Sequence, residues 1–258
     1  MIISENEPIA ASLSEAIHNG DIPGLQKLLT DHPELAAARL VGDDGHNGKV
    51  SRTLLHVATD WPGHFPNGVE SVAVLIKAGA EVNARIVGPS AETPLHWAAS
   101  SGDIEVLDAL IDAGADIEAS GAVIAGGTPL DDAVAFGQWS AAHRLIERGS
   151  SFALWHAAAL GLLEDIKAHF SGSALHGRYP WGTTPNHTPD KVTVSFWCAC
   201  HGGQQQAAEY LLERGALLNW ISVWDGLTPL DAARRNPNGD VVQWLQKRGA
   251  KSAAELHG

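Results

Sequence analysis

The amino-acid sequence predicts an all-α solenoid in which pairs of short helices stack side by side. Three observations lead to this fold class. A tetrapeptide recurs as TLLH at 53–56, TPLH at 93–96, TPLD at 128–131 and TPLD at 228–231. Weaker copies are marked by a downstream glycine, at Gly20, Gly161 and Gly203. The steps from Thr93 to Thr128 and from Val194 to Thr228 are 35 and 34 residues, a length typical of one helix pair per repeat.

Residues 93–119 show how one unit is built. Thr93 can cap the inner helix with its hydroxyl, and Pro94 suits the first helical position because the N–H that it lacks would have no partner there. Gly102 can adopt the left-handed conformation that ends this helix. An apolar stripe at three- and four-residue spacing then predicts an outer helix that ends at Gly114: Ile104, Leu107, Leu110 and Ile111. A single unit cannot bury this stripe alone, so the units must stack.

With this tetrapeptide and period the chain resembles the ankyrin repeat family. The resemblance covers nearly the whole chain in about seven units. It implies a single domain over residues 1–258, with units near 9–51, 52–91, 92–126, 127–150, 151–193, 194–226 and 227–258. It also implies that His56 and His96 hydrogen-bond within and between turns. We call the repeat position of His56 and His96 the histidine column. Counting from the tetrapeptide or back from the downstream glycine, other residues fill this column in the remaining units: Asp131, Trp155, Trp197 and Asp231.

Composition and charge narrow the classes of partner. The chain has 258 residues, of which 45% are hydrophobic and 18% charged, a balance typical of a globular protein. Its formal net charge of −13 disfavours nucleic acids and anionic membrane surfaces. We find no signal sequence and no apolar run long enough for a membrane span, so we expect a cytoplasmic protein. The two cysteines, Cys198 and Cys200, are too few for a disulfide framework, and we expect them to pack in the core.

Function is expected where the repeat is interrupted. Three units are longer than the others, which predicts insertions at 38–51, 60–70 and 171–193. In an ankyrin-like layout the first and third insertions fall in finger turns beside the concave groove, whereas the second lies between an inner and an outer helix. Long loops in compact domains are commonly functional. A loop over 171–193 that folded across the groove would turn an open surface into a pocket.

Aromatic and imidazole side chains gather in these segments. Indoles in loops favour binding because they combine a large contact area with a hydrogen-bond donor. An indole in the histidine column either fills a gap in the core or faces the groove. The candidate binding residues are Trp61, His64, His96, Trp155, Tyr179, Trp181, His187, Trp197, Trp220 and Trp224.

The sequence contains no strong signature of metal or cofactor chemistry. The local sets His56, Asp60 and His64, and Cys198, Cys200 and His201, do not match a zinc-ligand spacing. No phosphate-binding loop, dinucleotide fingerprint or nucleophile elbow is present. We therefore expect neither a metal nor a cofactor.

Two functional classes stay open. The resemblance favours a scaffold that binds a protein partner through its groove and finger loops. The alternative is a small-molecule-binding protein or an enzyme, a hydrolase or lyase, whose Trp- and His-lined pocket lies under the 171–193 loop. Acid and base groups would then come from His156, His201 and Asp132. The favoured interpretation of His156 and Asp132 is instead that they hydrogen-bond each other as neighbours in adjacent units.

Overall fold

The computed structural model describes the whole chain except residues 44–48, 185, 187–189, 237–238 and 258. The chain divides into two compact units, Met1–Ser150 and Ser151–Gly258. This division coincides with the expected boundary between the units near 127–150 and 151–193. The single domain over 1–258 stays a prediction.

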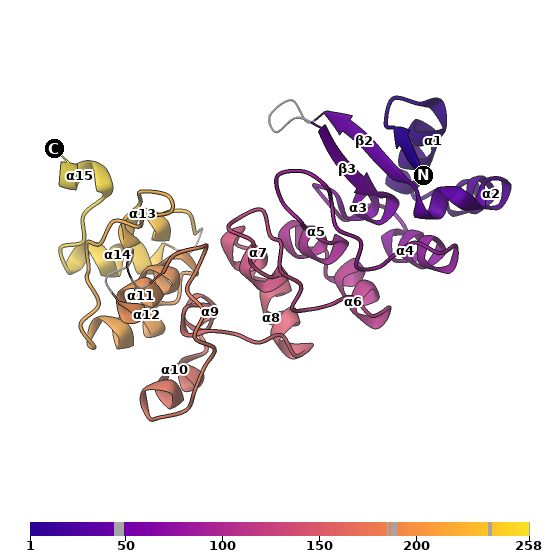
Figure 1. Cartoon of the computed structure of the whole chain (residues 1–258). Coiled ribbons are helices and arrows are strands. Elements are labelled where there is room, and N and C mark those ends of the chain that lie inside the picture. The colour runs from indigo at the N-terminus through magenta and orange to yellow at the C-terminus, as the bar shows by residue number, and fades with distance from the viewer. Residues whose placement is uncertain (44–48, 185, 187–189, 237–238, 258) are drawn as a thin grey trace. The chain divides into compact units, whose positions relative to one another are not determined.

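The first unit contains four packed helix pairs (Figure 1). In each pair an inner helix is followed by an outer helix. The pairs are α1 (Pro8–His18) with α2 (Ile22–Asp31), α3 (Leu54–Thr59) with α4 (Gly68–Lys77), α5 (Pro94–Ser101) with α6 (Ile104–Asp112), and α7 (Pro129–Ala135) with α8 (Trp139–Glu147). The inner helices pack in the order α1, α3, α5, α7, which is the stacking that the apolar stripes require.

A three-stranded sheet accompanies the first helix pairs and corrects the all-α prediction. Strand β1 (Ile2–Ser4) pairs in parallel with β2 (Arg39–Asp43), which pairs antiparallel with β3 (Lys49–Thr53). A short 3-10 helix, η1 (Pro33–Ala37), leads into β2. Residues 39–43 and 49–51 of the segment 38–51, expected as an insertion, thus lie in paired strands, and β3 directly precedes α3. Ser51 extends the pairing to Val87 in the next finger turn through two backbone hydrogen bonds of 2.9 Å.

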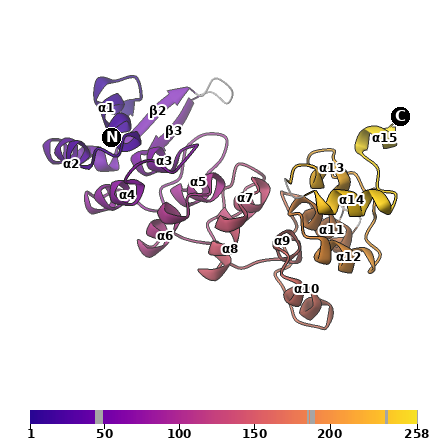
Figure 2. The same cartoon turned by 180° about the vertical axis from the view of Figure 1, so that it is seen from behind.

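The second unit contains three more helix pairs (Figure 2). They are α9 (Leu154–Leu160) with α10 (Leu163–Phe170), α11 (Lys191–His201) with α12 (Gln205–Leu212), and α13 (Pro229–Ala233) with α14 (Asp240–Lys247). A last short helix, α15 (Ala253–His257), follows. Among the described residues, none of these helices or those of the first unit has the length and apolarity to span a bilayer.

One capping arrangement starts most inner helices. The side chain at the third helical position accepts the backbone N–H of the residue before the helix, which would otherwise be unpaired. His96 does this in α5, where its Nδ1 accepts the N–H of Thr93 at 3.1 Å. Its other ring nitrogen, Nε2, must then carry the proton, and it donates to the carbonyl of Gly127 in the next repeat at 3.3 Å. The same role falls to a histidine or aspartate in four other helices: His56, Asp131, His156 and Asp231.

This arrangement corrects the expected register of α9. His156, rather than Trp155, accepts the capping N–H, which comes from Ala153 at 2.9 Å. The physical reason is helix length: α9 has seven residues before Gly161, whereas α5 has eight before Gly102. Counting back from the glycine therefore places the histidine column one residue too early. The sequence placed Trp155 in the histidine column and His156 one residue after it. In the structure His156 itself occupies the histidine column.

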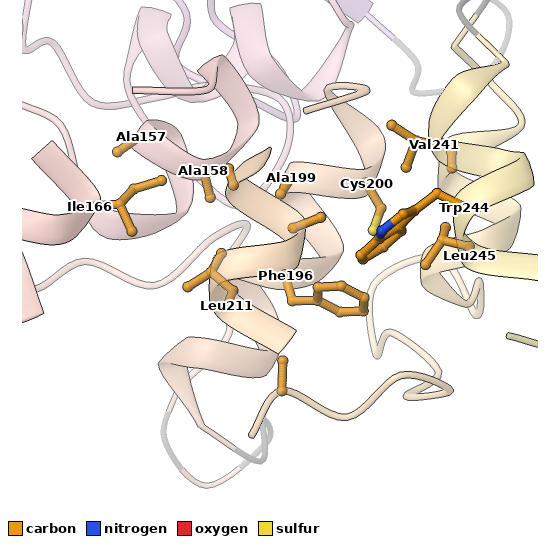
Figure 3. Packing of buried hydrophobic residues seen from close by; sticks show 14 of the residues in the cluster. Ala157, Ala158, Ile166, Phe196, Ala199, Cys200, Leu211, Val241, Trp244 and Leu245 are labelled. Carbon is orange, nitrogen blue, oxygen red and sulfur yellow. The ribbon is translucent and has the colours of Figure 1, made fainter. Parts of the chain in front are cut away.

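The core of the second unit is centred on α11. Phe196, Ala199 and Cys200 lie on its buried face, with helix α9 on one side and α14 on the other (Figure 3). Ala157 and Ala158 of α9 permit close approach of the inner helices, and Trp244 of α14 fills the opposite side. Cys198 and Cys200 are fully buried and unbonded to each other, as expected for packing residues, and burial raises the pKa of both thiols.

Candidate functional site

Five tryptophans of the second unit form one continuous aromatic cluster. Trp181, from the segment between α10 and α11, lies at its centre, with ring centroids 5.1 Å from Trp155, 6.0 Å from Trp197 and 5.0 Å from Trp224. Trp224 also lies 4.9 Å from Trp197 and 5.3 Å from Trp220. Because these indoles come from two inner helices and two turns, the structure brings together five of the candidate binding residues.

Trp197 occupies the histidine column of α11, as the sequence indicated. Its indole Nε1–H donates to the carbonyl of Leu227 at 3.0 Å, just before the next capping residue, Thr228. His96 makes the equivalent bond to Gly127, just before Thr128. The indole thus replaces the imidazole as the donor between repeats, and its larger ring, 1% exposed, also fills the core.

Trp155 is buried for a different reason. Its ring stacks on His156 with centroids 3.5 Å apart and contacts Trp181 on another side. Only 2% of the residue is exposed, yet its Nε1–H has no hydrogen-bond partner among the described residues. A buried donor without an acceptor is costly, typically about 1 to 3 kcal/mol. Such a group is unusual in a native core and indicates a site that an acceptor can enter.

A small cavity lies against this indole, between α9, α11 and residues 176–180; we call it the α9–α11 cavity. Its free volume is about 10 Å³, room for one water-sized group. Its apolar wall consists of Leu154, Pro180 and Val194. Its polar lining consists of Trp155, His169, His176, Arg178, Tyr179, Lys191 and Ser195. No aspartate or glutamate lines it in the part of the chain that the structure describes, although acids outnumber Lys and Arg by 30 to 17 over the chain.

A larger cavity of about 290 Å³ lies in the first unit; we call it the first-unit groove. The β2–β3 hairpin, the turn at 86–92 and helix α5 supply its walls. The lining includes Glu5, Val50, Arg52, Glu92, Trp97 and Val123. Arg52 is already paired, with Asp60 at 2.6 Å and Glu5 at 3.5 Å.

Glu92 is the principal anionic group of this groove. It is 7% exposed, and its Oε2 accepts from the indole Nε1 of Trp97 at 3.2 Å and from the hydroxyl of Ser90 at 3.0 Å. Trp97 in turn packs edge-on against His56, with centroids 5.0 Å apart. These contacts hold the carboxylate and the indole next to each other at the groove wall.

Asp132 is fully buried in α7, and neither carboxyl oxygen has a hydrogen-bond partner among the described residues. Burial, reinforced by the nearby charges of Glu92 and Asp131, raises the pKa of Asp132 to about 9. The carboxyl is therefore neutral at pH 7. Asp132 belongs to the first unit and His156 to the second, and a hydrogen bond between them stays a prediction.

The remaining candidate residues lie outside the tryptophan cluster. Trp61, in the segment between α3 and α4, is 74% exposed. His64 follows it, and its backbone N–H donates to Asp103 at 2.7 Å. His96 is the buried capping residue of α5, and burial lowers its pKa to about 4. His187 lies outside the described residues.

The three residues considered for acid–base chemistry occupy separate environments. His156 is a capping acceptor, Asp132 is a buried neutral acid, and His201 packs against Trp197 with ring centroids 5.5 Å apart. A catalytic role for them stays a prediction. Within the described ranges, no group of three or more His, Cys, Asp or Glu side chains is placed to hold a metal ion.

Several residues of both cavities escaped the sequence reasoning. In the first-unit groove they are Glu5, Arg52 and Glu92, and Trp97 was noted only as a repeat position. In the α9–α11 cavity they are His169, Arg178, Lys191 and Ser195. Trp97 follows His96 directly in the repeat, and this position alone did not indicate a groove. The sequence gave no indication of Arg178 and Lys191, because only the fold of the segment between α10 and α11 places both at the same cavity.

The stacked helix pairs define a helix-pair repeat protein. Residues 65–154 match the family model described as ankyrin repeats in three copies. This segment of the chain is therefore similar to ankyrin repeats, which generally mediate protein–protein interaction. The number of repeats beyond these three copies stays a prediction.

Among solved structures, the ankyrin repeat domain of human ASB11 is similar to this chain at 24% identity with a TM-score of 0.44. The alignment covers 80% of this chain and 91% of that one. A comparison with curated proteins found no match.

Proposed function

We propose that this chain is a binding scaffold that recognises a protein partner through the first-unit groove and its finger turns. The observation that carries the proposal is the pairing of Glu92 with Trp97 in a cavity of about 290 Å³. Carboxylate and indole together form a receptor for a basic side chain, since the carboxylate offers an ion pair and the aromatic face attracts a cation.

The charges around the groove favour the same partner. Arg52 is compensated by Glu5 and Asp60, so it leaves no unpaired cation to oppose a basic side chain. The raised pKa of Asp132, about 9, leaves that buried carboxyl without a charge at pH 7. The net charge of −13 adds a long-range attraction for a basic segment.

The rim of the groove offers apolar contacts. Val123 of the finger turn after α6 is 54% exposed and also lines the cavity. Val87, paired with the hairpin through Ser51, is 62% exposed. Exposed valines on successive finger turns suit a partner that combines one basic anchor with neighbouring apolar residues.

Selection from a random peptide library displayed on phage tests this proposal. We expect the immobilised full chain to enrich peptides with Lys or Arg at one fixed position next to apolar residues. Glu92→Gln removes the charge while keeping the shape, and should weaken the best peptide about tenfold to a hundredfold, equivalent to roughly 1.4 to 2.8 kcal/mol.

Glu81→Gln is the matched control, because Glu81 is exposed and does not line the groove. It should leave peptide affinity unchanged. Enriched peptides without a basic position, or equal losses in Glu92→Gln and Glu81→Gln, would contradict the proposal.

A further inference from the structure

The α9–α11 cavity differs in charge from the rest of the molecule. Most of its polar lining consists of hydrogen-bond donors or cations, including the guanidinium of Arg178, the ammonium of Lys191 and the indole N–H of Trp155. No aspartate or glutamate is among the described residues that line it. We propose that this cavity binds a carboxylate, with one oxygen accepting from the Nε1–H of Trp155.

The indole of Trp155 is a buried hydrogen-bond donor at the wall of this cavity. Its N–H is removed from water and has no acceptor among the described residues, so folding has already incurred the desolvation cost. An entering oxygen gains the hydrogen bond without that cost. An anionic acceptor gains more than a neutral one, because a charge-assisted bond is stronger.

The size of the cavity fits one oxygen of such a group. Its free volume of about 10 Å³ admits one water-sized group, such as a single oxygen, next to the apolar side chains of Leu154, Pro180 and Val194. Lys191 and His176 are exposed and can turn outward at little cost to admit the second oxygen. The ammonium of Lys191 lies 5.4 Å from the ring of Tyr179, which also lines the cavity.

The aromatic cluster explains how the indole is held. Trp155 lies between His156 at 3.5 Å and Trp181 at 5.1 Å, two ring contacts that limit its rotation. A fixed donor loses little conformational entropy when a ligand binds. The carboxylate can belong to a small carboxylic acid or to the C-terminus of a peptide chain.

The indole N–H signals in a ¹H–¹⁵N NMR spectrum of the full chain report binding directly. Sodium acetate replaces sodium chloride at constant ionic strength, and acetamide serves as the neutral probe of the same shape. We expect one indole signal, identified by its absence in Trp155→Phe, to shift with a saturable dependence on acetate. Acetamide should not reproduce this shift.

Two further variants keep the test independent of Trp155. Arg178→Gln should raise the apparent Kd for acetate at least tenfold, and Lys191→Met should raise it severalfold. Lys247→Met on α14 is the matched control, because Lys247 is exposed and does not line the cavity. A tripeptide with a free C-terminus, compared with its amide, separates the two sources. Tighter binding of the free tripeptide than of acetate, with no shift from the amide, assigns the site to chain ends, and tighter binding of acetate assigns it to small acids.

The proposal fails if the Trp155 signal does not move with acetate, or moves equally with acetamide. It also fails if Arg178→Gln leaves the acetate titration unchanged in a folded protein, or if phosphate shifts the signal at lower concentration than acetate does. These outcomes do not bear on the proposed function of the first-unit groove, which is tested separately by peptide selection and Glu92→Gln.

Discussion

Trp197→Ala is expected to lower the free energy of unfolding of the second unit by about 3 to 5 kcal/mol, the usual cost of deleting a large aromatic from a core. Trp197 is 1% exposed and contacts Trp181 and Trp224. Its removal also leaves the carbonyl of Leu227 without its donor from the preceding repeat. Urea unfolding followed by far-UV circular dichroism measures the loss.

Two other variants separate packing from hydrogen bonding at this position. Trp197→Phe keeps a ring in the core but removes the donor, so it should cost less than Trp197→Ala. Trp61→Ala is the matched control, because Trp61 is 74% exposed and its loss should change stability by less than about 0.5 kcal/mol. A cost for Trp197→Ala no larger than that of Trp61→Ala would contradict the assignment of Trp197 to the core between repeats.

Asp132→Asn is expected to stabilise the first unit increasingly as pH rises. The pKa of Asp132 is raised from 3.8 to about 9 in the folded chain, so the unfolded chain loses this proton at a lower pH than the folded chain. Wild-type stability therefore falls as pH rises between about 4 and 9, by at most about 1.4 kcal/mol per pH unit from this group. Asparagine does not titrate and removes this penalty.

Urea unfolding at pH 5, 6, 7 and 8 measures the effect. The stability difference between Asp132→Asn and wild type should grow by roughly 2 to 4 kcal/mol over this range. His56 and His96, whose pKa values burial lowers to about 3 and about 4, destabilise both proteins alike below pH 6.5 and cancel in the difference. Glu15→Gln, at an exposed position of α1, should show no such trend. A pH-independent difference for Asp132→Asn would mean that Asp132 is ionised in the folded chain.

The helix starts could be predicted because their chemistry is local. Thr93 and His96, or Thr128 and Asp131, satisfy the same backbone groups within one turn, so the tetrapeptide marks the helix wherever it occurs. The register of α9 could not be predicted in this way. Ala153 has no hydroxyl to mark the cap, and the glycine used as a reference follows a helix that is one residue shorter.

The strands were missed for a similar reason. The segments 39–43 and 49–53 are short and contain few apolar residues, and β2 also pairs with β1, which lies far away in sequence. Arg39 adds contacts that no pattern reveals, since its guanidinium and Nε bond to Ser51 and to the carbonyl of Arg85.

The tryptophan cluster and the two cavities differ in how far the sequence predicts them. The tryptophan cluster was partly predictable, because its members fall at repeat positions or in the finger turns next to them. The first-unit groove could not be predicted, because Glu92 and Trp97 line a common cavity only together with residues of strands β2 and β3. The α9–α11 cavity also could not be predicted from the sequence, because its lining residues come together only in the folded chain. Arg178 and Lys191 lie at either side of a long segment, and only its fold brings them to Trp155.

We propose that recognition takes place in the first-unit groove, while the repeated helices support it. Titration of the selected basic peptide into the ¹⁵N-labelled full chain tests this claim most directly. We predict that the indole N–H signal of Trp97, identified by Trp97→Phe, moves most, together with backbone signals of Val50, Glu92 and Val123. Shifts concentrated on the outer helices α4, α6 and α8, with the Trp97 signal unmoved, would contradict it.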